Sequence, residues 1–228
     1  MKKIDIISFL KYCDFDYRQY IEEVLRIGDT TAIRELRGVT YRRNYERGLL
    51  LMAIIHKFDS TKFLEFGTGR GFATACALFL KNGLDITTID NKSSEQSKNL
   101  IEGLGICTNS IFFLGMNSKH LSAEDIGDGF DLVFIDGGHD YKSVKNDYEI
   151  AVKCCEKGII VFDDFRNKHA GVKKFIKSLD VTKILVNTQG WIWKNKMMKK
   201  TKDGDGIIDD KEYKSGQVIV PVGISVDI

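Results

Sequence analysis

The chain has 228 residues, of which 43% are hydrophobic and 29% are charged. This composition is typical of a globular domain with a sizeable core. The formal net charge of +2 argues against nucleic acid as a partner, because such proteins usually carry a stronger or more clustered basic excess.

The first sixty residues are predicted to be mainly helical, most clearly over the sequence YRRNYERGLLLMAIIHKF at residues 41–58. We expect residues 1–60 to form a helical cap over the ligand-binding edge of the following domain. A basic cluster of Arg42, Arg43 and Arg47 lies in this segment, and a second cluster covers residues 194–202. Both are interpreted as solvated faces, since most charge runs are.

From residue 61 onward, short apolar runs alternate with amphipathic stretches of helical length. Strands are predicted at 62–67, 85–90, 110–115, 130–136 and 158–164, and helices at 72–82, 93–105, 122–127, 141–156 and 170–179. This alternation predicts an α/β fold of the doubly wound, Rossmann-like type, with a mostly parallel sheet. Ligands of such sheets bind where the parallel strands end.

After Asp180 the pattern changes. Residues 182–187 and 190–195 are predicted to form a C-terminal antiparallel strand pair that completes a seven-stranded sheet. The main α/β domain is therefore assigned to residues 61–195. Residues 196–228 are assigned to an extension that contains an acidic loop.

A glycine-rich turn follows the strand at 62–67 in the sequence LEFGTGRGF, with Gly67, Gly69 and Gly71 placed before a helix. Glycines let the backbone turn tightly and approach a ligand closely. Asp90 ends the next strand, 19 residues after Gly71, where a carboxylate commonly binds the hydroxyls of a ribose. The two features predict a pocket for an adenosine-type ligand. The alternative is that the glycines only make a tight turn.

The spacing Glu-x-Gly-x-Gly-x-Gly resembles the motif of Rossmann-like S-adenosylmethionine-dependent methyltransferases rather than the dinucleotide fingerprint. The resemblance covers residues 63–195 and implies S-adenosylmethionine as the cofactor. It places at the cofactor Glu65, Gly67, Thr68, Gly69, Gly71, Asp90, Asp136 and, by position after the third strand, Met116 and Asn117.

Three carboxylates follow two further strands. Asp136 ends the strand at 130–136, and Asp163 and Asp164 end the strand at 158–164. Neighbouring strands would bring these acids together, and unpaired they would repel one another. A divalent cation would resolve the repulsion, and oxygen ligands suit Mg²⁺. His139, which follows Asp136 by three residues, is then placed to accept a proton as a general base.

The sequences IDGGHDY and FDDF resemble metal-dependent O-methyltransferases that act on hydroxyls of sugars and related small molecules. The resemblance implies Mg²⁺ bound by Asp136, Asp163 and Asp164, with His139 as the base and Asp136 also in the catalytic set. Alternatively, Asp164 caps the next helix or pairs with a lysine, and His139 is only hydrogen-bonded.

Residues 201–212, TKDGDGIIDDKE, resemble an EF-hand loop, because Asp203, Asp205, Gly206, Ile208 and Glu212 occupy positions of that pattern. Thr201 stands where the first Asp is expected. A polar turn between two strands and a weak Ca²⁺ site at 203–212 both remain open.

The predicted function is methyl transfer from S-adenosylmethionine to a hydroxyl of a small molecule of the sugar or natural-product type, assisted by Mg²⁺. The alternatives are a metal-independent methyltransferase and a non-catalytic nucleotide- or calcium-binding module. Five cysteines without a CxxC pair and the absence of a signal-peptide pattern predict a cytoplasmic protein. No membrane partner is expected, and a homo-oligomer is left open.

Overall fold

The computed structural model describes residues 1–31, 34–36, 39–41, 45–92, 94–188, 200–201, 204–205 and 216–227. For residues 34–36, 39–41, 200–201 and 204–205 it describes the backbone alone. No helix in this part of the chain combines the length and the apolar character that a membrane crossing requires.

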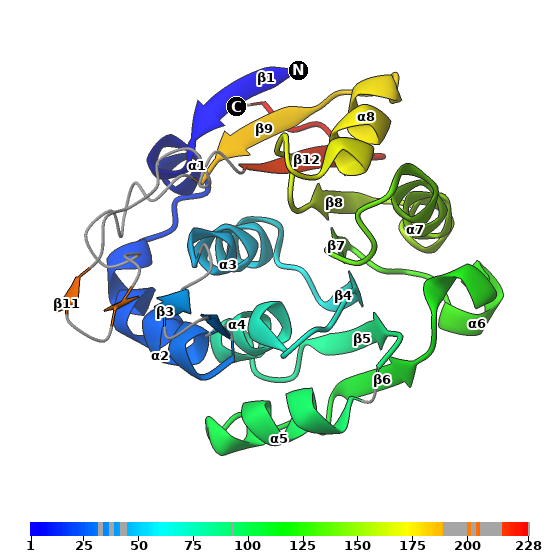
Figure 1. Cartoon of the computed structure of the whole chain (residues 1–228). Helices are drawn as coiled ribbons and strands as arrows, with labels where there is room; N and C mark the ends of the chain where they lie inside the picture. Colours follow the sequence, from blue (N-terminus) through cyan, green and yellow to red (C-terminus); the bar gives the residue numbers. More distant parts are fainter. Residues whose placement is uncertain are drawn as a thin grey trace.

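An eight-stranded sheet forms the centre of the molecule, in the order β1-β9-β12-β8-β7-β4-β5-β6 (Figure 1). All neighbouring strands are parallel except β12, which runs antiparallel to both β8 and β9. The strands are β1 (Lys2–Asp5), β4 (Lys62–Phe66), β5 (Asp85–Asp90), β6 (Ile111–Gly115), β7 (Leu132–Ile135), β8 (Gly158–Phe162), β9 (Ile184–Asn187) and β12 (Gly216–Val222).

Helices cover both faces of this sheet (Figure 1). One face carries α1 (Ile6–Tyr12), α2 (Ile21–Thr31), α3 (Glu46–Phe58), α4 (Phe72–Leu80) and α5 (Glu95–Gly103). The other face carries α6 (Ala123–Ile126), α7 (Tyr141–Cys154) and α8 (Ala170–Ser178). Because β7 and β8 lie between these layers, every residue of both strands is buried, which explains their unbroken apolar sequences.

Short 3₁₀ helices lie at η1 (Tyr17–Tyr20) and η2 (Ser118–His120). A second, four-stranded sheet has the order β11-β10-β3-β2. Its strands are β2 (Arg34–Leu36), β3 (Val39–Tyr41), β10 (Lys200–Thr201) and β11 (Gly204–Asp205). The predicted Rossmann-like α/β fold is confirmed, including the mostly parallel sheet and the antiparallel pairing near the C-terminus.

The N-terminal prediction is only partly correct. Helices are present, but residues 2–5 form β1, which pairs with β9 at the edge of the main sheet. Helix α3 is not a cap over the ligand edge, because residues 49–55 are fully buried in the core against the sheet face. Its strongly apolar sequence directs it to the interior.

The C-terminal prediction also needs correction. The antiparallel partner of β9 is β12, at residues 216–222, and the expected partner at 190–195 lies outside the described residues. Part of the segment assigned to an extension therefore lies between β8 and β9. Residues 218–220 are buried, so this strand belongs to the core of the sheet.

The carboxyl ends of β4, β5, β6, β7 and β8 share one edge of the sheet because these strands are parallel. From β4 the chain proceeds outward in one direction to β5 and β6, and in the other to β7 and β8. Ligands of doubly wound sheets bind beside such a reversal of strand order. The predicted site residues lie at these strand ends or shortly after them.

Gly67 sits where β4 and β7 end side by side. It adopts a φ of +95°, and a Cβ at this position would lie 2.3 Å from the Asp136 carbonyl oxygen. The nitrogen of Asp136 in turn donates to the Phe66 carbonyl at 2.8 Å. Gly67 therefore allows the glycine turn and the Asp136 loop to touch.

We expect Gly67→Ala to lower the free energy of unfolding by about 2–4 kcal/mol, because it combines a left-handed φ with a backbone clash. Gly69→Ala is the matched control: its φ is +56°, but no atom lies within 4 Å of a Cβ there. Its cost should be about 1 kcal/mol. Urea denaturation of both variants measures the difference, and equal costs would contradict the close packing at Gly67.

Candidate active site

The glycine turn and Asp90 are brought together, as the sequence predicts. Asp90 Oδ2 accepts a hydrogen bond from the Gly69 nitrogen at 2.8 Å, and Oδ1 accepts from the Lys92 nitrogen at 3.0 Å. Thr68 Oγ1 lies 2.6 Å from Thr88 Oγ1 of β5. These contacts fix the carboxylate at the end of β5. A carboxylate has about four acceptor sites, so capacity for ribose hydroxyls remains.

Glu65 lies beneath the turn and is 1% exposed. Its Oε2 accepts from Thr74 Oγ1 at 2.6 Å and from Thr88 Oγ1 at 2.5 Å. Burial raises the pKa of Glu65 to about 7, although both hydrogen bonds favour the charged form. These contacts link β4 to α4 and β5, so Glu65 supports the turn from below.

Met116 and Asn117 follow β6 and are exposed. The side-chain oxygen of Asn117 accepts from the Lys119 nitrogen at 3.0 Å and caps η2. Both residues follow β6, which pairs with β5, so they lie at the same edge of the sheet as Asp90. Their contact with the adenine remains a prediction.

Asp136 and Asp163 lie at the ends of adjacent strands, and both bind one buried cation. Arg47 Nη1 is 2.8 Å from Asp136 Oδ2 and 2.5 Å from Asp163 Oδ2. The Arg47 side chain is 7% exposed and its guanidinium lies over the Phe72 ring. Burial opposes its charge, but the two carboxylates outweigh burial and raise the pKa of Arg47 further. The predicted repulsion between the acids is therefore neutralised by an arginine.

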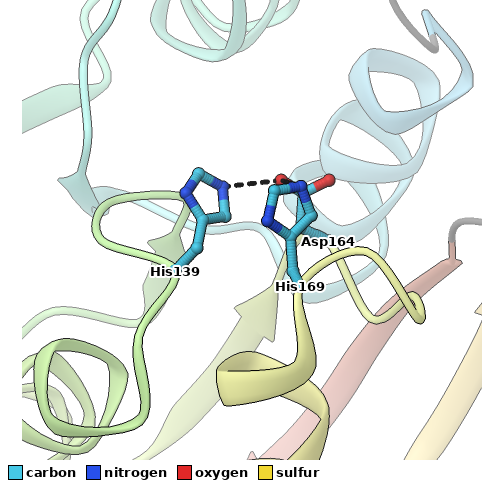
Figure 2. A group of neighbouring side chains, drawn as sticks. All are labelled: His139, Asp164 and His169. Atoms are coloured by element: carbon cyan, nitrogen blue, oxygen red, sulfur yellow. Dashed lines mark hydrogen bonds and ion pairs between the residues drawn. The ribbon is translucent and has the colours of Figure 1, made fainter.

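Asp164 belongs to a different cluster, although it follows Asp163 directly. Its Oδ2 lies 2.7 Å from His139 Nε2 and 3.3 Å from His169 Nε2 (Figure 2). Its Oδ1 lies 2.9 Å from Arg166 Nη2. The two imidazole rings stack with their centroids 4.0 Å apart. The sequence left open that Asp164 pairs with a lysine, whereas its partners in the structure are Arg166, His139 and His169.

Burial and the neighbouring charges together determine the pKa values of His139, Asp164 and His169. The hydrogen bond to Asp164 raises the pKa of His139 against the effect of burial. Burial lowers the pKa of His169, although Asp164 opposes that effect. Burial alone would raise the pKa of Asp164, but His139, Arg166 and His169 together hold that pKa at about 2. Asp164 is thus ionised at neutral pH and directs one imidazole.

Among the described residues, the three predicted Mg²⁺ ligands are not a group whose ligand atoms all lie within 4.8 Å of one another. Asp163 Oδ1 accepts from Gln217 Nε2 and from the Asp164 nitrogen, both at 2.7 Å, and Oδ2 binds Arg47. Asp164 turns toward the histidines. The residues therefore do not fit the predicted Mg²⁺ site.

Within the described part of the chain, His139, Asp164 and His169 have ligand atoms that all lie within 4.8 Å of one another, close enough to share a metal ion. Their nitrogen donors suit a transition metal better than Mg²⁺. Arg166 Nη2 lies 2.8 Å from His169 Nε2, and its positive charge opposes a second cation there.

Four residues of the site were not predicted from the sequence: Arg47, His169, Arg166 and Gln217. The interpretation of Arg47 as part of a solvated cluster is wrong, since the side chain is buried. One signal was available: Arg47 directly precedes the apolar run GLLLMAII, where a charge enters the core only with a partner. The EF-hand resemblance at 201–212 falls almost wholly outside the described residues; Thr201 and Asp205 lie in β10 and β11.

Comparison with known proteins is consistent with the fold and the glycine turn. Residues 64–165 match a family model described as "Methyltransferase domain". This range begins in β4 and ends just after Asp163 and Asp164. Residues 64–165, slightly less than half of the chain, are thus similar to a methyltransferase domain.

Individual relatives are distant. A protein of Acanthamoeba polyphaga mimivirus, described as uncharacterized, is 27% identical over 126 residues, or 48% of this chain and 53% of that protein. The chain thus matches about half the length of that relative.

Solved methyltransferases share the fold across most of the chain. An O-methyltransferase from Bacillus cereus, in complex with S-adenosylhomocysteine, has a TM-score of 0.56 at 18% identity, covering 89% of this chain and 90% of that chain. The O-methyltransferase TomG from Streptomyces achromogenes, in complex with S-adenosylmethionine, also has a TM-score of 0.56, at 15% identity, with 89% and 90% covered.

We expect Glu65→Gln to change how stability depends on pH. Folding raises the pKa of Glu65 from 4.5 to about 7, so the folded state binds the proton more tightly than the unfolded state. Wild-type stability should therefore fall by about 3 kcal/mol as pH rises through this range. A neutral glutamine removes this loss.

Urea denaturation at pH 5 and pH 8 measures this effect. The variant should gain stability relative to wild type at the higher pH. Glu156→Gln, which removes an exposed carboxylate of the same chemistry, serves as the control. The same pH slope in wild type and Glu65→Gln would contradict a protonated, buried Glu65.

Proposed function

We propose that the protein transfers a methyl group from S-adenosylmethionine to a hydroxyl of a small polyhydroxylated molecule, such as a sugar or a related natural product. The observation that carries the proposal is the position of His139. Its imidazole is 43% exposed, is held by the ionised Asp164, and lies at the same edge of the sheet as the glycine turn. A reachable base beside a cofactor turn is what O-methylation needs.

The cofactor would lie across the glycine turn. Gly67, Gly69 and Gly71 adopt positive φ values, which glycine tolerates, and because they have no side chains a ligand can approach the backbone closely. Asp90 stands at the end of the neighbouring strand, where its carboxylate can accept from ribose hydroxyls. When bound, S-adenosylmethionine supplies an electrophilic methyl group on a positively charged sulfur.

His139 would then remove the proton from the acceptor hydroxyl. Its Nε2–H donates to Asp164 Oδ2, which leaves the Nδ1 lone pair free for the proton. The same division of the two nitrogens, one oriented by a carboxylate and the other acting as base, operates in catalytic triads. The ionised Asp164 also stabilises the imidazolium that forms. A pocket between the β7 and β8 strand ends is lined by Asp136, His139, Asp163 and Asp164.

No step of the proposed mechanism requires a metal ion. Mg²⁺ assistance follows from the resemblance to metal-dependent enzymes, but Asp136 and Asp163 bind Arg47 instead. That observation favours the metal-independent alternative. Asp136 keeps a positional role, because its loop touches Gly67 and its side chain fixes Arg47 beside the cofactor turn.

The cofactor is tested first by thermal unfolding with S-adenosylhomocysteine. At 100 times the dissociation constant, binding should stabilise the fold by about 2.7 kcal/mol, which corresponds to roughly 5–10 °C in a chain of this length. Asp90→Ala should reduce the shift to roughly 1 °C, because losing two charged hydrogen bonds weakens binding about 100-fold or more.

Asp85→Ala is the matched control, since Asp85 is an exposed residue at the opposite end of the same strand. It should keep the full shift. An equal loss in both variants would point to damage to β5. A shift with NAD instead of the homocysteine compound would contradict the cofactor assignment and favour a nucleotide-binding module.

Catalysis is tested by transfer of labelled methyl groups to a panel of sugars, polyols and phenols, with amines and RNA as controls. His139→Gln should reduce kcat about 10²- to 10⁴-fold and leave S-adenosylhomocysteine binding unchanged. Asp164→Asn should shift the acidic limb of the rate profile to lower pH, because a neutral partner no longer raises the pKa of His139.

An unshifted limb in Asp164→Asn would contradict the base assignment. Methylation of RNA or amines alone would contradict the acceptor class. Cofactor binding without any transfer across the panel would favour the non-catalytic alternative.

A further inference from the structure

Arg47 joins two carboxylates that come from different strand ends. A single nitrogen, Nη1, contacts Oδ2 of Asp136 and Oδ2 of Asp163. The side chains of Arg47, Asp136 and Asp163 are 7%, 14% and 6% exposed. Solvent therefore screens these charges weakly, and the three form one buried unit.

The Arg47 nitrogen lies where a bridging cation would lie. Mg²⁺ binds carboxylate oxygens at about 2.0–2.1 Å, so an ion shared by the same two oxygens would overlap Nη1. Asp163 has no freedom to turn another oxygen toward such an ion, because its Oδ1 accepts from Gln217 and from the Asp164 backbone. Gln217 is itself fixed by a hydrogen bond from Thr188.

Arg47 also cannot withdraw easily. It lies in the first turn of α3, next to Gly48, where a Cβ would lie 2.8 Å from Cys76 Sγ and 2.9 Å from the Phe72 ring. Helices α3 and α4 therefore touch at this point and hold the backbone of Arg47 in place. A guanidinium cannot lose its proton at any ordinary pH, so the charge stays as well.

We propose that the Arg47 guanidinium takes the place of a divalent cation between Asp136 and Asp163. The chain thus keeps two acidic strand ends together in a fixed position, without a metal between them. This assignment concerns cation binding, and its test reads metal binding directly. The outcome is therefore independent of whether the proposed methyl transfer is correct.

The experiment measures binding of Mn²⁺, used as a paramagnetic substitute for Mg²⁺, by the loss of the free-ion signal in electron paramagnetic resonance. Wild type should show no site that depends on Asp136 or Asp163. Arg47→Met keeps an apolar stem and removes the charge. This variant should gain one site per chain that binds Mn²⁺ at least 10-fold more tightly than wild type does, and added Mg²⁺ should displace the bound Mn²⁺.

Two matched variants identify the gained site. Arg47→Lys keeps a positive charge at the same position and should gain no site. Adding Asp163→Asn to Arg47→Met should abolish the gained site. His169→Gln in the same background should leave it unchanged, which separates it from the cluster of His139, Asp164 and His169.

Stoichiometric Mn²⁺ binding by wild type that disappears in Asp163→Asn would overturn the proposal, since the cation would then bind despite Arg47. A folded Arg47→Met variant that gains no site would overturn it too. Non-cooperative unfolding would reveal a misfolded Arg47→Met variant. In that case wild type, Asp163→Asn and Arg47→Lys still decide the question, because all three keep a positive charge at residue 47.

Discussion

Two carboxylates at adjoining strand ends require a nearby positive charge, and Arg47 meets this requirement from inside the protein. The constraint extends through the fold. Helix α3 packs against the sheet with residues 46–55 buried, and this position brings its first turn to the edge. Strand β12 must lie beside β8 so that Gln217 can fix Asp163. The geometry of the edge thus depends on the first quarter of the chain and on its last strand.

The consecutive acids Asp163 and Asp164 serve different clusters because of one backbone angle. Asp164 has a φ of +58°, a left-handed conformation that aspartate tolerates better than most residues. This turn sends its carboxylate toward His139, His169 and Arg166, while Asp163 stays with Arg47. Non-glycine residues in this region carry a modest conformational cost, and such residues concentrate at functional sites. The structure therefore separates a closed, buried charge unit from a more exposed one that can exchange protons.

The sequence predicted what local patterns determine. Alternating apolar runs and helical stretches define the order of strands and helices. The glycine turn and Asp90 also lie close together in the sequence, so their contact could be predicted. The partners of Asp163 could not be predicted in this way, because Arg47 and Gln217 lie 116 and 54 residues away. Repulsion between the acids was foreseen correctly; whether a metal or an arginine relieves it depends on where α3 packs. The same limit applies to β12, whose place between β8 and β9 is a matter of tertiary pairing.

The way the acids are neutralised bears on how a hydroxyl would be activated. A bound metal lowers the pKa of a coordinated hydroxyl, so that a modest base suffices. Arg47, enclosed between Asp136 and Asp163, offers no such coordination, so in the proposed mechanism the base alone would remove the proton. Asp164 supports that task, because its hydrogen bond raises the pKa of His139 and makes the neutral imidazole a stronger proton acceptor. In the proposed mechanism the two clusters would therefore be complementary: Arg47 would hold the strand ends together without a metal, and the Asp164–His139 pair would supply the activation that a metal otherwise provides.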